Sequence, residues 1–326
     1  MGFEHVVITG GMGFLGYHIA LRLRQDQAFK RLTIVDTAEE QMQPLVMPLL
    51  HDPQVIHIKK SILDKECFEN ISTDVDAIIH AAGFLGVRNV AEHSRQALDI
   101  NIIGTRNCLE FAAKQTQLKR FLAFSTSEVY GPDASALDEE HPLVIPSRGR
   151  RWCYAASKVA VEQYTKAYAR ECSVPYSIVR PFNIYGPYRK GSNAISRFMH
   201  CAQKGVPLQI NGNGSQRRAW CYVDDFVEGV MLMLNHDSAT NETFNIGNPD
   251  THCSVLNLAQ IIIALTGSSS TIQVTESDVE DVRDRTPLIA KAQRFFQYAP
   301  KVALIDGLRK TLHWASNYQS HILPCA

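Results

Sequence analysis

Short apolar runs alternate with amphipathic stretches through the first 182 residues. Runs such as HVVIT at 5–9 are apolar at successive positions, as in strands buried on both faces of a parallel sheet. Between these runs, apolar residues recur at helical spacing, as in FLGYHIALRLRQ at 14–25. The pattern predicts strands at 5–9, 31–36, 54–59, 76–82, 120–127 and 176–182, and helices at 14–25, 96–116 and 154–172. This alternation indicates βαβ units, and therefore an α/β fold with a doubly wound parallel sheet.

The pattern changes after residue 182. Polar, glycine-rich stretches such as NGNGSQRR at 211–218 indicate long loops. The apolar run ETFNIG at 242–247 indicates one more strand that returns to the sheet. Further helices are expected near 194–204, 224–235, 254–266, 287–298 and 304–318. We therefore expect a domain over 1–182, completed by the strand near 242–247, and a smaller C-terminal substrate-binding region over 183–326.

The charge balance argues against a polyanionic partner. The 326 residues include 33 Lys and Arg and 33 Asp and Glu, so we expect no nucleic-acid partner. No apolar run reaches the length of a membrane span, and the N-terminus enters a strand without a signal-peptide pattern. The 8 cysteines form no C-x-x-C pair, and the 12 histidines form no H-E-x-x-H motif. We expect reduced thiols, no metal site, no membrane contact and a cytoplasmic protein.

Glycines follow the first predicted strand at the point where a helix begins. Gly10, Gly13 and Gly16 let the backbone approach a pyrophosphate, and the helix N-terminus offers unpaired N–H groups to it. Asp36 ends the second predicted strand, twenty residues after Gly16. A carboxylate there accepts hydrogen bonds from an adenosine ribose and repels a 2′-phosphate, which favours NAD over NADP. A flavin site, or an α/β fold without a nucleotide, is the alternative.

Tyr154 and Lys158 lie four residues apart on a predicted helix, so they share one face of it. An ammonium beside a phenol favours the phenolate and lowers the pKa of the phenol, which suits a general base. An exposed pair without a chemical role is the alternative. Ser125, Thr126 and Ser127 end the fifth predicted strand, at the sheet edge where α/β proteins bind ligands.

Several motifs occur together and in order along nearly the whole chain. They are TGGMGFLG (9–16), HAAG (80–83), NIIGT (101–105), STSEVYG (125–131), YAASK (154–158), RPFNIYGP (180–187), GNGSQRRAWCYVDD (212–225), FNIGNP (244–249) and RTPLIAKA (285–292). This set resembles the extended short-chain dehydrogenase/reductase superfamily, and within it the NAD-dependent nucleotide-sugar epimerases, dehydratases and decarboxylases. The resemblance implies a Rossmann-type sheet, NAD as the cofactor and a nucleotide-diphosphate sugar as the substrate.

The resemblance also implies roles for individual residues. Tyr154 would act as the base, Lys158 would stabilise the phenolate and hold the nicotinamide ribose, and Thr126 would share the proton of the sugar hydroxyl. Glu128 would be a second acid or base near C5 or C6 of the sugar, although a solvated glutamate is an equal alternative. The cofactor contacts implied in this way are Gly10, Gly13, Phe14, Leu15, Gly16, Asp36, Ser61, Ile62, Ala81, Ala82, Ser125, Tyr154, Lys158 and Pro181.

For the substrate, the resemblance implies that Asn183, Arg218 and Arg285 bind the diphosphate. Arginine suits this task because its planar fork meets phosphate oxygens in pairs. A carboxylated sugar would need a further cation, for which Arg189, Lys190, Arg217 and Arg285 are candidates. Some expected residues differ. Asn211 stands where an aromatic residue often stacks on uracil, Ser61 stands at a usual aspartate of the adenine site, and Ala219 and Leu288 replace aspartates.

The reaction is left open by these motifs. We expect a C4 epimerase, with a UDP-glucuronate-type decarboxylase as the alternative. A 4,6-dehydratase ranks lower because Ser127 stands where that branch has an aspartate. A non-catalytic dinucleotide-binding regulator is a further alternative, but regulators of this superfamily typically lack the Tyr or the Lys, and both are present here. A plain alcohol dehydrogenase is another, but it would not need the diphosphate-binding residues Asn183 and Arg218. Relatives pair through two helices, so we expect a homodimer formed by 96–116 and 154–172.

Overall fold

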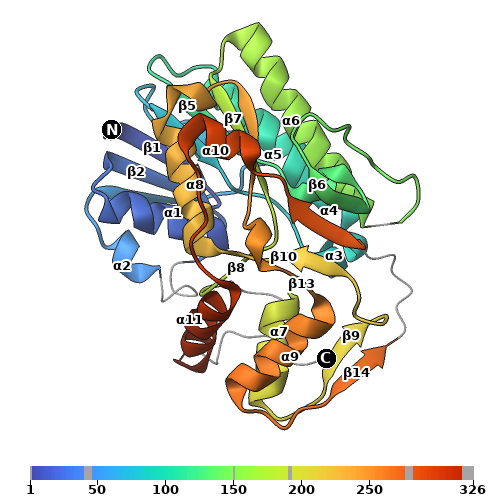
Figure 1. Ribbon diagram of the computed structural model, residues 1–326. Coiled ribbons are helices and arrows are strands. Elements are labelled where there is room, and N and C mark those ends of the chain that lie inside the picture. Colours follow the sequence, from blue (N-terminus) through green and yellow to red (C-terminus); the bar gives the residue numbers. More distant parts are fainter. Residues whose placement is uncertain (1, 40–45, 150, 190–192, 276–281, 318–326) are drawn as a thin grey trace.

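The chain forms three layers, with a parallel sheet between two sets of helices (Figure 1). The computed structural model describes residues 2–39, 46–149, 151–189, 193–275 and 282–317. The seven strands are β1 (Phe3–Thr9), β2 (Phe29–Asp36), β3 (Val55–Lys59), β4 (Ala77–His80), β5 (Arg120–Phe124), β7 (Tyr176–Pro181) and β12 (Glu242–Ile246). Their order is β12-β7-β5-β4-β1-β2-β3. The order reverses between β1 and β4, which is where such sheets bind their ligands. The expected Rossmann-type α/β fold is therefore confirmed.

The strands are buried on both faces because helices cover both. Helices α1 (Phe14–Gln25) and α8 (Val223–Asn235) cover one face, and α5 (Gly104–Ala112) and α6 (Trp152–Cys172) cover the other (Figure 1). Val6 and Ile8 of β1 pack into the core beneath α1, whereas Val7 packs into the core beneath α5. Alternate residues of a strand point to opposite faces, so a continuous apolar run is what such a strand requires.

The helix expected at 96–116 differs in its interior. The structure has α3 (Val87–Glu92), α4 (Ser94–Leu98), a π-helical turn at Asp99–Ile103 and α5, which ends at Ala112. The π turn adds one residue to the helix, and the hydroxyl of Thr105 donates to the carbonyl of Asn101 at 2.5 Å. The turn aims the side chain of Asn101 at the backbone N–H of Phe84, 2.8 Å away, and at Ser157, 2.9 Å away.

The second region contains short strands that the sequence pattern did not predict. A four-stranded sheet has the order β13 (His252–Ser254), β10 (Arg217–Ala219), β15 (Asp284–Pro287) and β6 (Asp133–Leu137). Two further pairs are β8 (Ile184–Tyr185) with β11 (Cys221–Tyr222), and β9 (Leu208–Asn211) with β14 (Ile272–Thr275). The helix expected at 287–298 is α10 (Ala290–Phe296), because the residues before it belong to β15. The other helices are α2 (Met47–Leu50), α7 (Ala194–Gln203), α9 (Val255–Thr266) and α11 (Leu304–Asn317).

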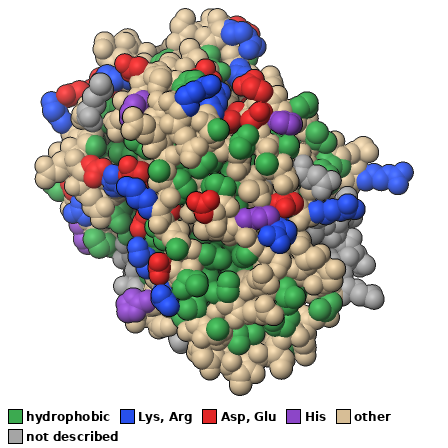
Figure 2. Space-filling view, viewed as in Figure 1, with side chains coloured by type: hydrophobic (Ala, Val, Ile, Leu, Met, Phe, Trp, Pro, Cys, Tyr) green, Lys and Arg blue, Asp and Glu red, His purple; other side chains and the backbone are tan. Residues whose placement is uncertain are grey.

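The two regions share strands. β6 lies in the first half of the chain but pairs with β15, and β12 lies in the second half but pairs with β7. Figure 2 shows acidic and basic side chains interspersed on one face of the molecule, in keeping with equal numbers of the two kinds along the chain. Across the described residues, none of the helices has both the length and the apolar character that a bilayer crossing needs.

Candidate active site

The glycine turn after β1 forms a cradle with an open helix N-terminus. Gly10 has φ +73°, and a Cβ on it would lie 2.6 Å from the backbone nitrogen of Ala82. A Cβ on Gly16 would collide with the carbonyl oxygen of Gly10, so α1 packs tightly on the turn. Gly13 caps α1 without a side chain, which leaves the first amides of the helix to an incoming anion. The cradle fits the pyrophosphate of a dinucleotide.

Asp36 is fixed in the orientation that an adenosine ribose requires. Its carboxylate accepts hydrogen bonds from the backbone N–H groups of Met12 and Ala38, each at 3.0 Å. A carboxylate has about four acceptor positions, so acceptor capacity is left for ribose hydroxyls. Ser61 and Ile62 follow β3, the strand beside β2. The hydroxyl of Ser61 accepts a hydrogen bond from the N–H of Leu63 at 3.2 Å, and Ile62 is buried. The residues present therefore fit NAD at its adenosine half.

The other expected cofactor contacts gather at the carboxyl edge of the sheet. Ala81 and Ala82 follow β4 directly and lie against Gly10. Phe14 and Leu15 begin α1 and are half-buried, and Pro181 ends β7. These positions surround the point where the strand order reverses.

Lys158 lies on the inner face of α6 and is 4% exposed. Its Nζ donates to the carbonyl of Phe124 at 2.8 Å and lies 6.0 Å from the centroid of the Tyr154 ring. Burial lowers the pKa of Lys158 to about 8, because the apolar surroundings disfavour the ammonium.

The phenol of Tyr154 is hydrogen-bonded to the side chain of Thr126. Its pKa is nevertheless raised, first by burial and then by the negative charge of Glu128, while Thr126, Arg189 and Arg285 act in the opposite direction. The lowered pKa expected from the Tyr-Lys pair is therefore wrong for the protein without cofactor. The physical reason is that the ring is enclosed and faces a carboxylate, which the helical spacing did not reveal.

Glu128 lies among arginines rather than in solvent. It belongs to the 3₁₀ turn η4 (Ser127–Tyr130) after β5, and its side chain is 17% exposed. Its Oε1 lies 3.4 Å from Nη1 of Arg285 and 3.5 Å from Nη2 of Arg151. Arg285, expected at a phosphate, thus contacts the acid beside Tyr154. Arg218 pairs in register with Arg285 on β10 and β15, so both side chains lie on the same face of the small sheet.

Three other candidates lie at different places around this centre. Asn183, with φ +46°, donates from its side chain to the carbonyl of Ala219 at 3.1 Å. The guanidinium of Arg189 lies 5.3 Å above the ring of Phe14 and near Tyr154. Arg217 points to the opposite face of β10 from Arg218, where it lies 3.4 Å from His252. Lys190 lies outside the described residues.

Sequence reasoning missed two buried charged residues behind the centre. The hydroxyl of Ser125 donates to Glu162 at 2.6 Å, and Glu162 pairs with Arg180. The hydroxyl of Ser125 is therefore engaged away from the cradle, and a cofactor contact would have to use another atom of Ser125. The available signal was a glutamate four residues after Lys158, on the same buried face of the helix.

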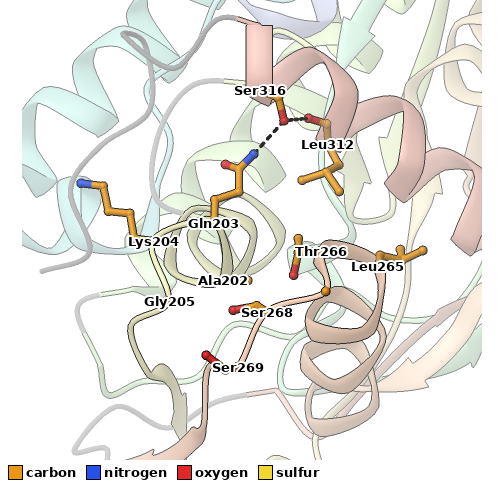
Figure 3. Close-up of a pocket in the computed structure, with 11 residues that line it drawn as sticks. Ala202, Gln203, Lys204, Gly205, Leu265, Thr266, Ser268, Ser269, Leu312 and Ser316 are labelled. Atoms are coloured by element: carbon orange, nitrogen blue, oxygen red, sulfur yellow. Dashed lines mark hydrogen bonds between the residues drawn. The ribbon is translucent and has the colours of Figure 1, made fainter.

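A polar hollow of about 600 Å³ lies at another place, where the C-terminal ends of α7 and α9 meet α11 (Figure 3). Gln203 donates to Ser316 across it at 2.9 Å. Helix α7 has 10 residues and is therefore roughly 15 Å long. The hollow lies at the C-terminal end of α7, whereas Arg189 precedes its N-terminal end. Lys204 is the one ionisable side chain among the residues that line the hollow, so the hollow offers no acid–base pair like that of Tyr154 and Lys158. Among the described residues, no group of three or more His, Cys, Asp or Glu could hold a metal ion.

Comparison with known proteins identifies the family. The model of the NAD dependent epimerase/dehydratase family matches residues 6–247. The UDP-N-acetyl-α-D-glucosaminuronate decarboxylase of Bacillus cytotoxicus is 34% identical over 324 residues, which cover 95% of this chain and 97% of that protein.

Solved structures agree with this match. The UDP-glucuronic acid 4-epimerase of Bacillus cereus, in complex with UDP-glucuronic acid and NAD, has a TM-score of 0.86 and 25% identity, covering 96% of this chain and 99% of its own. The dTDP-glucose 4,6-dehydratase of Streptomyces venezuelae has a TM-score of 0.88 and 26% identity, covering 99% and 100%. The glycine cradle and Asp36 fit the cofactor for which the family is named. The chain belongs to the NAD-dependent epimerase/dehydratase family.

Proposed function

We propose that this chain is an NAD-dependent decarboxylase of a nucleotide-activated uronic acid. The observation that carries the proposal is the set of guanidinium groups of Arg151, Arg189 and Arg285 around Glu128 and Tyr154. A sugar carboxylate buried at this place needs such cations, because an unpaired buried charge is costly. The decarboxylase from Bacillus cytotoxicus, a relative that acts on a uronate, supports the same reaction.

The chain's own residues would act on the sugar as follows. Bound NAD supplies the hydride acceptor for C4 and later returns the hydride. Tyr154 takes the proton of the 4-hydroxyl, with Thr126 in hydrogen bond to the phenol. The ammonium of Lys158 and the positive charge of the oxidised cofactor favour the phenolate, which offsets the raised pKa of Tyr154 in the cofactor-free protein. Arg189 and Arg285 would hold the carboxylate at C6 so that the C5–C6 bond stands perpendicular to the plane of the ketone at C4.

Loss of CO2 then follows from the ketone at C4. The C5–C6 bond breaks, and its electrons move into an enolate whose oxygen lies at Tyr154. Glu128 would relay a proton from solvent to C5, and Tyr154 would return its proton to the oxygen at C4 as that carbon is reduced again, so no net oxidation occurs. Retention of the cofactor through the cycle is required, because free NADH would abort it. The nucleotide diphosphate would extend over Asn183 and Arg218, so that 183–326 mainly binds the substrate and 1–182 with β12 binds NAD.

C4 epimerisation is the second candidate, and it was the first expectation from the sequence. It is favoured by the likeness to the UDP-glucuronic acid 4-epimerase, a protein of similar fold that binds a uronate. Both reactions share the ketone at C4 and differ in whether CO2 leaves. Dehydration is disfavoured because Ser127 is 3% exposed and carries no acid.

Product analysis tests the proposal. The purified protein is incubated with UDP-glucuronate, UDP-N-acetylglucosaminuronate, UDP-glucose, UDP-N-acetylglucosamine and CDP, dTDP and GDP hexoses, and the products are examined by mass spectrometry and NMR. Loss of CO2 from a uronate is expected. An unchanged mass with inverted C4 would establish the epimerase instead, and loss of water would refute the reading of Ser127.

A matched pair of variants tests the binding of the carboxylate. Arg189→Met is expected to raise KM for uronates at least tenfold, because the loss of one charge-assisted contact is worth about 1.5–3 kcal/mol. Arg217→Met, on the opposite face of β10, is the control and is expected to leave KM unchanged. Equal KM values in the two variants would remove Arg189 from the carboxylate site.

Two expectations stay predictions. The cytoplasmic location is one, and the homodimer formed through α4–α5 and α6 is the other. Val161, an apolar residue of α6, is fully buried in the core of its own chain. Tyr164 and Tyr168 are half-buried on α6 and remain candidates for the dimer face.

A further inference from the structure

A buried ion pair lies directly behind the catalytic residues. Glu162 on α6 is fully buried, and Arg180 on β7 is 2% exposed. Nε of Arg180 donates to Oε1 of Glu162 and Nη2 donates to Oε2, each at 2.8 Å. Such a two-pronged pair is geometrically specific, but a buried pair stabilises a fold little more than well-packed apolar residues would. Stability alone therefore does not account for it.

Glu162 links the two segments that carry the proton-transferring groups. It follows Lys158 by one helical turn, on the same face of α6. Its Oε1 also accepts the hydroxyl of Ser125 at 2.6 Å, and Ser125 directly precedes Thr126. One carboxylate thus joins the helix of Tyr154 to the end of β5, where Thr126 meets the phenol.

Arg180 links the same carboxylate to the turn that carries Glu128. Its Nη1 donates to the hydroxyl of Tyr130 at 2.7 Å and to the carbonyl of Glu139 at 3.1 Å. Tyr130 belongs to the turn η4, and its hydroxyl donates onward to Asn245 on β12 at 2.8 Å. The network therefore fixes the end of β5, the turn η4 and α6 relative to one another.

We propose that Glu162 and Arg180 are positioning residues that set the Thr126–Tyr154 hydrogen bond and the place of Glu128. Both side chains are buried, and they bond to Ser125, Tyr130 and the carbonyl of Glu139. The pair affects the reaction by fixing distances, because a displacement of 1 Å at a reacting group can cost about 10²-fold in rate. The inference rests on the proposed role of Tyr154 as the group that exchanges the proton.

The test replaces both members of the pair together, so that neither is left as a lone buried charge. Glu162→Leu with Arg180→Met removes both charges and keeps most of the volume, so the double variant is expected to fold. We expect kcat to fall about 10²-fold, with KM and NAD affinity changed less than about threefold. Glu162→Asp, which keeps the carboxylate, is expected to recover part of the rate. Lys119→Met, at the opposite end of β5, removes a cation paired with Asp76 and should leave kcat unchanged.

A second readout does not depend on turnover. The ionisation of Tyr154 is followed by ultraviolet difference absorbance in the NAD complex, with Tyr154→Phe as the blank. A weakened bond from Thr126 should raise the apparent pKa of Tyr154 by about one unit in the double variant. A folded double variant with unchanged kcat and unchanged titration would overturn the inference, and so would a rise in KM alone. If the wild type turns over no nucleotide sugar, the proposed function fails, while the titration still decides the positioning role.

Discussion

Replacement of Lys158 by Met should abolish activity but stabilise the folded protein, and the gain in the free energy of unfolding should depend on pH. Burial lowers the pKa of Lys158 from 10.5 to about 8 in the folded protein. One pKa unit corresponds to about 1.4 kcal/mol, so keeping the ammonium buried costs about 3 kcal/mol below pH 8. The variant also loses the hydrogen bond to the carbonyl of Phe124, which is worth about 1 kcal/mol. At pH 7 the cofactor-free variant Lys158→Met should therefore be more stable than the wild type by about 2 kcal/mol.

The pH dependence provides the sharper test. Between pH 8 and 10.5 the unfolded chain binds more protons at Lys158 than the folded chain, so the stability of the wild type rises with pH through this window. The variant lacks this contribution. Its advantage at pH 7 should shrink by about 3 kcal/mol by pH 10.5 and change sign a little below about pH 10. A change of about 3 kcal/mol corresponds to about 5 °C in the difference of Tm for a chain of this size.

The assay is thermal or urea unfolding of NAD-free wild type and variant at several pH values from 7 to 10.5. The difference in stability between the two proteins at each pH removes the contributions of the titrating groups that they share. Lys114→Met, at an exposed position, is the control for loss of a lysine and should show no pH-dependent difference. A variant that is less stable than the wild type at pH 7, or a difference that stays constant with pH, would refute the reasoning.

Three further changes have definite expected outcomes. Tyr154→Phe should lower kcat at least about 10³-fold, the effect of a lost general base, while NAD affinity by titration stays within threefold; substantial turnover in this variant would exclude Tyr154 as the base. Asp36→Asn should raise NADP affinity about tenfold relative to NAD in fluorescence titrations, because a repelling charge at the ribose is removed; an unchanged ratio would contradict the role of Asp36. Gly16→Ala should cost about 3 kcal/mol or more in unfolding measurements, since its Cβ meets the carbonyl of Gly10, whereas Gly2→Ala, with open space around it, should be neutral.

Local pattern was enough for the elements that carry the chemistry. Helix α6 was expected at 154–172 and spans Trp152–Cys172, and the strand expected at 242–247 is β12. Long helices and continuous apolar strands repeat their period often enough to be recognised. Thr126 and Glu128 follow β5, and Tyr154 lies in the first turn of α6, so the motifs place all three near the carboxyl edge of the sheet.

The rest depends on tertiary contacts that no local pattern contains. Strands of two to five residues such as β8 and β6 are too short to show a period and exist only because a distant partner pairs with them. The raised pKa of Tyr154 arises from enclosure by other elements and from the approach of Glu128. The direction of the Ser125 hydroxyl is set by its hydrogen bond to Glu162. A glutamate on a helix usually faces solvent, so the helical pattern alone does not predict that Glu162 is buried.

The exchange of β6 and β12 between the two regions has a consequence for dissecting the chain. A fragment ending at residue 182 would leave the edge of β7 without β12, and β6 without β15. An exposed apolar strand edge recruits other chains, so this fragment would aggregate when produced alone. Fragments 1–182 and 183–326 made in the same cell would supply each other's missing strands. The protein is thus suited to fragment complementation, in which recovered NAD binding reports that the two pieces have met.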